Sequence, residues 1–154
     1  MGQQFKLSAS LEDYIEAIYN IVAEKEVARG KDIAARLSVS GASVTEALRS
    51  LAKKGLINYA PYEAISLTDT GRRAAEDVVR RHNALKRFFV SVLAVDKDLA
   101  EQGACRVEHA APQEIIDRII SFSRFLEIRP RDGEKLIKDF ADFCKQNRPG
   151  PSGK

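Results

Sequence analysis

The stretch from residue 33 to residue 57, IAARLSVSGASVTEALRSLAKKGLI, decides the fold. Two short runs carry apolar residues at helical spacing: Ile33, Ala34 and Leu37, then Val44, Ala47, Leu48 and Leu51. SVSG separates the runs, and Gly41 in it is expected to adopt a positive φ, whereas Gly55 closes the second run. Two short helices joined by a tight turn predict a helix-turn-helix.

The hydrophobic period changes on both sides of this motif. Downstream, Leu56–Tyr59 and Ala64–Leu67 are short β-leaning runs around Pro61, which predicts a small hairpin, or wing. Upstream, SASLEDYIEAIYNIVAE has an apolar stripe at helical spacing, with Ser10 and Asp13 in an N-cap arrangement. The N-terminal part of the chain is therefore expected to form a winged helix-turn-helix.

The rest of the chain is expected to be helical. A long helix from about residue 68 carries a seam with steps of three and four residues: Ala75, Val78, His82, Leu85, Phe89 and Val92. We expect a connection over 96–104, in which Leu99 and Ala100 could begin a turn of helix. A helix after Pro112 and an amphipathic piece over 132–143 follow. The predicted class is mainly α, with a DNA-binding domain at 1–71, a helical dimerisation and metal-binding domain at 72–143, and a disordered tail at 144–154.

Charge and composition narrow the function. The chain has 154 residues and a net charge of +3, too small to imply nucleic acid by itself. Residues 29–54 contain six basic and two acidic residues, however, a local excess of 6 − 2 = +4 that suits a phosphate-facing surface. No apolar run is long enough to cross a bilayer and the N-terminus has no apolar signal core, so we expect a cytoplasmic protein without a membrane partner.

The second helix of the motif is expected to enter the major groove of double-stranded DNA. Its N-terminal residues could meet base edges: Ser40, Ala42, Ser43, Thr45 and Glu46. Four cations could hold phosphates without reading sequence: Arg29, Lys31, Arg36 and Arg49. Because readers of this kind usually bind two half-sites, we expect a homodimer.

CRVEH, residues 105–109, is the strongest candidate for chemistry. Cys105, Glu108 and His109 stand at i, i+3 and i+4, which share one face of a helix. With Asp13, Glu16 and His82 they make six possible donors, and this mixture of oxygen, nitrogen and one sulfur suits first-row divalent metals. The set draws on both halves of the chain, so a bound metal could favour one arrangement of the halves.

Several of these stretches also resemble one family. GACRVEHA, the upstream RRH and LEDYIEAIY, together with the winged motif and SLTDTG, resemble the diphtheria-toxin-repressor family of iron- and manganese-dependent transcriptional repressors over residues 8–128. The resemblance implies a dimer that binds operator DNA when loaded with Fe²⁺ or Mn²⁺ and represses metal-uptake genes. It further implies that one metal is held by Asp13, Cys105, Glu108 and His109, and a second by Glu16 and His82 with Glu108 bridging.

The identity of the metal depends on particular residues. Asp13 and Glu16 match the manganese-type members, whereas Cys105 matches the iron-type members and, as a thiolate, favours Fe²⁺ over Mn²⁺. We therefore expect Fe²⁺, with Mn²⁺ as the alternative and Zn²⁺ or Co²⁺ able to substitute in vitro. Lys86 and Glu101 stand where iron-type members carry an acidic ligand and a His ligand of an ancillary site.

Other functions remain open on the sequence alone. A winged-helix regulator that senses another signal would bind DNA regardless of a chelator. A small metalloenzyme could use Cys105, Glu108 and His109 around an open coordination position, but the remaining features serve dimerisation or DNA, so we expect no enzyme. A structural metal that never exchanges is a third possibility.

Overall fold

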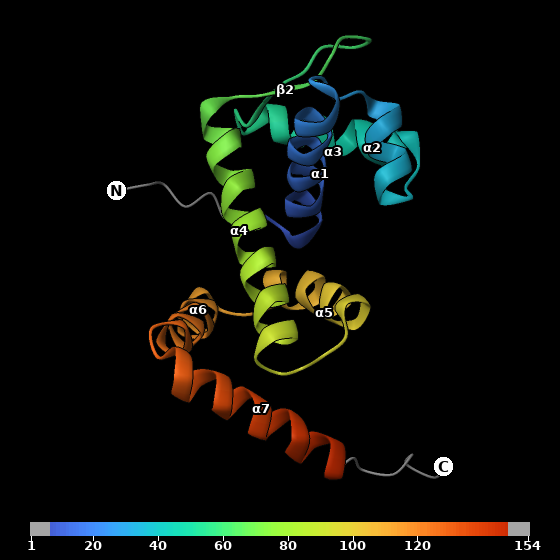
Figure 1. Ribbon diagram of the computed structural model, residues 1–154. Helices are drawn as coiled ribbons and strands as arrows, with labels where there is room; N and C mark the ends of the chain where they lie inside the picture. Colours follow the sequence, from blue (N-terminus) through green and yellow to red (C-terminus); the bar gives the residue numbers. More distant parts are fainter. Residues whose placement is uncertain (1–6, 148–154) are drawn as a thin grey trace. The chain divides into compact units, whose positions relative to one another are not determined.

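A computed structural model describes residues 7–147. The elements follow in the order α1 (Ala9–Lys25), α2 (Gly30–Leu37), α3 (Gly41–Lys53), β1 (Ile57–Asn58), β2 (Ser66–Leu67), α4 (Asp69–Ser91), α5 (Lys97–Ala110), α6 (Gln113–Glu127) and α7 (Pro130–Gln146). The chain divides into two compact units, residues 1–80 and 81–154, and this division falls inside α4, the long helix of Figure 1. The boundary expected between residues 71 and 72 also lies inside α4, nearer its start.

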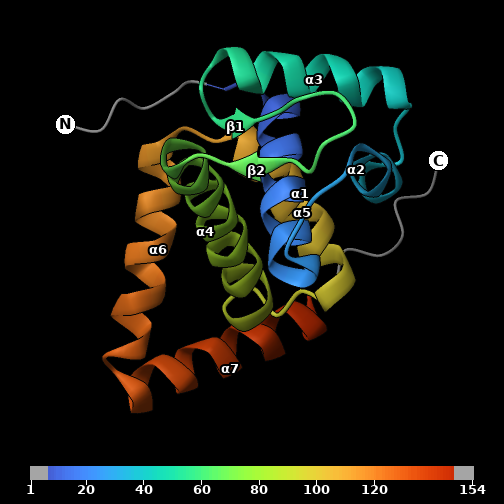
Figure 2. The same cartoon turned by 90° about the horizontal axis from the view of Figure 1, so that it is seen from above.

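The first unit is a winged helix-turn-helix, as predicted. α1, α2 and α3 pack around buried apolar residues from all three helices and the hairpin, including Ile15, Ile18, Ile33, Leu48, Leu51 and Leu56. β1 and β2 pair antiparallel with Ile57 opposite Leu67, and the hairpin packs against α1 and α3 (Figure 2). Burial of this apolar face is the main source of stability for such short helices.

Two local predictions in this unit are wrong in detail. Ser8, not Ser10, caps α1, and its hydroxyl accepts a hydrogen bond from the Leu11 amide at 3.3 Å. The positive φ in the turn between α2 and α3 falls on Ser38, at 54°, and not on Gly41. Gly41 begins α3 because Ser40 takes the extended N-cap conformation immediately before it.

The junction of the wing with α4 is tight. Gly55 closes the run of α3, as predicted, and it does so with a φ of 70°. Thr68 then donates its hydroxyl hydrogen to the Gly55 carbonyl at 2.7 Å, and its amide to the Leu56 carbonyl at 3.1 Å. A Cβ on Gly71 would lie 1.7 Å from that same Leu56 oxygen, so only glycine fits at this position in the first turns of α4.

In the described part of the second unit, all regular secondary structure is α-helical. α5 begins at Lys97, earlier than expected, because Asp96 caps it by accepting hydrogen bonds from two amides in the first turn; the predicted connection at 96–104 is thus mostly helix. α6 and α7 meet at a short turn (Figure 1), and α7 continues to Gln146, beyond the expected end at Phe143. The rest of the predicted tail, residues 148–154, lies outside the described residues.

Candidate metal centre and DNA-reading helix

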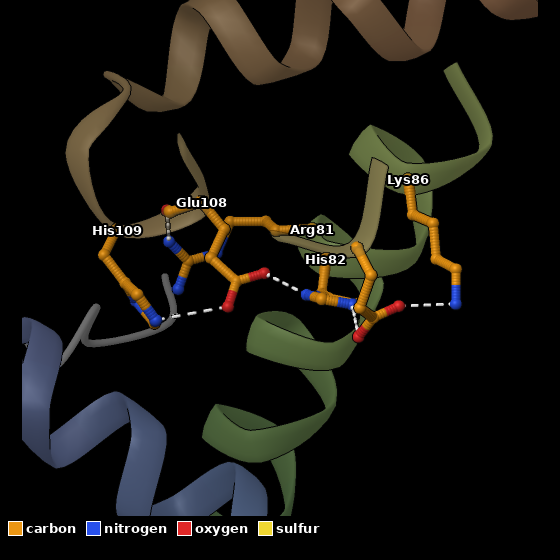
Figure 3. A network of polar contacts seen from close by, with 6 residues as sticks. Arg81, His82, Lys86, Glu108 and His109 are labelled. Atoms are coloured by element: carbon orange, nitrogen blue, oxygen red, sulfur yellow. Dashed lines mark hydrogen bonds and ion pairs between the residues drawn. The ribbon is translucent and has the colours of Figure 1, made fainter. Parts of the chain in front are cut away.

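His82 on α4 lies between two carboxylates from α5 (Figure 3). Its Nδ1 is 2.7 Å from Glu108 Oε2, and its Nε2 is 2.9 Å from Glu101 Oε1. A neutral imidazole can donate from only one ring nitrogen, so it cannot satisfy both carboxylates. Satisfying both contacts therefore requires either one more proton in the cluster or a cation bound at the carboxylates.

Glu108 is the centre of this cluster and has no exposed surface. Its second oxygen, Oε1, lies 3.1 Å from His109 Nε2, yet forms no hydrogen bond among the described residues. A buried carboxylate oxygen without a hydrogen bond is costly and calls for an explanation. Imidazole nitrogens and carboxylate oxygens are donors for first-row divalent metals, so the residues at Glu108 fit a metal ion.

Arg81 positions Glu108 through the backbone. Arg81 as a whole is 9% exposed, and its Nη1 donates a hydrogen bond to the Glu108 carbonyl oxygen at 2.8 Å. The guanidinium thereby fixes the segment of α5 that carries Glu108 and His109 against α4. The sequence analysis did not predict this role for Arg81. The residue is recognisable in the sequence as the basic residue directly before His82, but helical periodicity does not show which backbone atom its side chain contacts.

Lys86 and Glu101 form the outer end of the cluster. Lys86 Nζ lies 2.5 Å from Glu101 Oε2, while the other oxygen of Glu101 contacts His82. The hydrogen bond from Lys86, assisted by the charge of His82, lowers the pKa of the Glu101 carboxyl below its usual range, although burial acts in the opposite direction. Glu101 is therefore held in its anionic form by protein cations.

The remaining predicted ligands, Cys105, Asp13 and Glu16, lie on α5 and α1. Cys105 is exposed on α5, one turn before Glu108 and His109, so CRVEH is helical as predicted. Asp13 and Glu16 are half-buried on α1, in the first unit. Of the six proposed donors, the second unit thus brings His82, Glu108 and His109 into contact, and the roles of Asp13, Glu16 and Cys105 stay predictions.

α3 presents most of the residues expected to read bases. Ala42, Ser43, Glu46 and Arg49 are exposed, while the opposite side of the helix is buried in the core. Three of the hydroxyls expected to read bases are already engaged. Ser40 accepts from the Ser43 amide at 3.1 Å and lies 2.9 Å from the Ser43 hydroxyl, whereas Thr45 donates to the Gly41 carbonyl at 3.0 Å.

The expected phosphate-binding cations differ in their surroundings. Arg29 and Lys31 are exposed at the start of α2. Arg36 instead forms an ion pair with Glu24 of α1 at 2.5 Å, a contact that competes with a phosphate. The prediction that Arg36 binds phosphate therefore requires this exposed pair to open.

Fold and site together define a class, that of a helix-turn-helix DNA-binding protein with a candidate metal centre. Models of two domains match the sequence: "Iron dependent repressor, N-terminal DNA binding domain" at residues 6–65, and "Iron dependent repressor, metal binding and dimerisation domain" at residues 68–137. The chain belongs to the iron-dependent repressor family and is a metal-dependent transcriptional repressor. The resemblance and the fold class predicted from the sequence are confirmed.

Individual relatives support the same assignment. The chain is 35% identical over 127 residues to the HTH-type transcriptional regulator MntR of Lysinibacillus sphaericus, covering 82% of this chain and 91% of the relative. It is 34% identical over 117 residues to an uncharacterized HTH-type regulator of Methanocaldococcus jannaschii, covering 75% and 94%. A solved manganese-dependent transcriptional repressor in complex with manganese matches with a TM-score of 0.65 and 34% identity, over 72% of this chain and 51% of that one.

The described part of the chain, residues 7–147, contains no helix that is both long and apolar enough to cross a membrane.

Proposed function

We propose that this repressor binds operator DNA as a homodimer when Fe²⁺ occupies the site at Glu108, and that it controls metal-uptake genes. The observation that supports the metal dependence is the buried carboxylate of Glu108, which lies between two imidazoles and keeps one oxygen without a hydrogen bond. A divalent ion would supply the positive charge that this cluster needs and would link its donors. Asp13 and Glu16 are proposed as further ligands from the DNA-binding half.

The chain's own residues have separable roles in this proposal. His82 holds Glu108 Oε2 from α4, His109 offers a nitrogen at Oε1, and Arg81 fixes the backbone of α5 between them. Because α4 and α5 each supply donors, filling the site would fasten these helices to one another. Such an effect would favour one conformational state of the repressor, which is what a regulatory ligand must do.

Cys105 is the basis for proposing Fe²⁺. A thiolate is a softer ligand than a carboxylate, and affinities of divalent ions at a given site generally rise from Mn²⁺ to Fe²⁺. Mn²⁺ is the second candidate, because the chain is similar to a solved repressor described as manganese-dependent. Cells can also select the ion by availability, so affinity alone does not decide between them.

The test is an operator-binding titration on the full chain under anaerobic conditions. Duplexes are first selected from a random-sequence library by Fe²⁺-loaded and, separately, by Mn²⁺-loaded protein, and their affinities are then measured by fluorescence anisotropy at buffered Fe²⁺ or Mn²⁺ and with chelator. Fe²⁺ should activate binding, and Glu108→Gln should weaken metal binding by about 100-fold or more, since even residues that only orient ligands contribute 10- to 100-fold. Glu114→Gln, an exposed carboxylate on α6, is the matched control.

The outcomes separate the candidates. Operator binding that is unchanged by chelator would show a regulator of another kind. Activation at physiological Mn²⁺ with no response to Fe²⁺ would replace the ion but keep the site. An unaltered metal response in Glu108→Gln would refute the assignment of Glu108.

A further inference from the structure

The polar cluster of the second unit is a chain of alternating charge that ends in a lysine. From the inside outward, the described contacts run from Glu108 to His82, from His82 to Glu101, and from Glu101 to Lys86 (Figure 3). Lys86 follows His82 by four residues on α4, so both side chains lie on the same face of that helix. The ammonium therefore stands where Glu101 would otherwise meet a cation from solution.

Glu101 is also well placed to bind a metal in the absence of that lysine. Its side chain is 50% exposed, so ions can reach it, and one of its oxygens already lies 2.9 Å from an imidazole nitrogen. Carboxylate oxygen and imidazole nitrogen are both ligands that divalent metals accept. In this chain, however, the ammonium of Lys86, 2.5 Å from Glu101 Oε2, compensates the negative charge of the carboxylate and places a like charge next to any incoming metal ion.

We propose that Lys86 serves as an intramolecular counter-cation that closes the Glu101 end of the cluster to metal ions and confines binding to the Glu108 end. This inference rests on the proposed function only in taking Glu108 as the end that binds metal. Lys86 then determines how many ions the chain accepts. It is a positioning and exclusion residue, and it does not itself touch the bound ion.

The experiment counts Mn²⁺ ions bound per chain. The full chain is stripped with chelator, dialysed and titrated with Mn²⁺, and free Mn²⁺ is followed by its electron paramagnetic resonance signal. Lys86→Met keeps an unbranched side chain of similar length without its charge, and it should bind one more ion per chain than wild type. Lys86→Arg keeps the charge and should bind the wild-type number. Lys86→Met combined with Glu101→Gln should lose the extra ion.

Each outcome decides something. Equal numbers of ions in wild type and Lys86→Met would overturn the role of Lys86 and leave the proposed function standing. An ion bound by Lys86→Met but none by wild type would support the role of Lys86 and refute the proposed function. An extra ion that persists after Glu101→Gln would place it elsewhere and overturn the inference. Circular dichroism confirms folding, which we expect to be intact because the Lys86 side chain is 41% exposed.

Discussion

Replacing Gly71 with alanine should destabilise the protein by about 2 kcal/mol. The new Cβ would start 1.7 Å from the Leu56 carbonyl oxygen, and contacts of this kind below 3.0 Å are essentially never seen, so the backbone must move by at least 3.0 − 1.7 = 1.3 Å. Overpacking of this kind costs roughly 1–3 kcal/mol. Moving Leu56 also strains its hydrogen bond with the Thr68 amide, worth about 1 kcal/mol. The higher helix propensity of alanine offsets about 0.5–1 kcal/mol.

The assay is guanidinium denaturation followed by circular dichroism, since the chain has no tryptophan for fluorescence. Gly41→Ala is the matched control, because a Cβ at this helical glycine meets nothing within 4 Å. It should leave stability unchanged or raise it by up to about 0.5–1 kcal/mol. If Gly71→Ala proves as stable as wild type, the close approach of α4 to the wing does not constrain position 71, and the reasoning is refuted.

Three further substitutions test separate parts of the molecule. Arg49→Ala should weaken binding to all duplexes alike and reduce the slope of log affinity against log salt by about 1, as for loss of one phosphate contact; an unchanged slope in an anisotropy titration would exclude that contact. Asp96→Ala removes the cap of α5, whose carboxylate accepts from the Asp98 and Leu99 amides at 3.1 and 3.0 Å, and should cost about 1 kcal/mol in a denaturation experiment; no loss would mean that the cap contributes nothing. Cys105→Asp should shift the metal response from Fe²⁺ toward Mn²⁺, because it exchanges a soft donor for a hard one; an unaltered Fe²⁺ to Mn²⁺ preference in metal-dependent operator binding would show that this thiol does not select the ion.

The winged motif could be predicted because its signals are local. Helical spacing, the residues of the hairpin and the glycine after α3 each act over a few positions, and the structure has all three. The two wrong predictions in this unit, the cap of α1 and the positive φ in the turn, each concern a choice between neighbouring residues that hydrophobic periodicity does not distinguish. Ser8 and Ser10 are both capable caps, and either Ser38 or Gly41 could have taken the left-handed conformation in the turn.

The candidate metal centre was predictable in composition but not in its connections. CRVEH and His82 could be singled out because their residue types and spacing suit a metal. Its connections depend on how α4 packs against α5. They are the contacts of His82 with Glu108 and Glu101, of Arg81 with the Glu108 carbonyl, and of Lys86 with Glu101. These contacts link residues 15 to 27 positions apart, a separation over which helical periodicity carries no information.

If α3 enters the major groove as proposed, the residues on its exposed edge limit which base pairs it can distinguish. Its first two turns, GASVTEAL at residues 41–48, contain no arginine, lysine, asparagine or glutamine, the side chains that grip purines with two hydrogen bonds. The Ala42 methyl can meet a thymine methyl and the Glu46 carboxylate can accept from a cytosine amine, while the Ser43 hydroxyl is partly engaged with Ser40. These two turns can therefore distinguish base pairs only by contacts to pyrimidines or by how easily the duplex bends. We expect operators read by this helix to tolerate exchange of one purine for the other wherever the paired pyrimidine is not contacted.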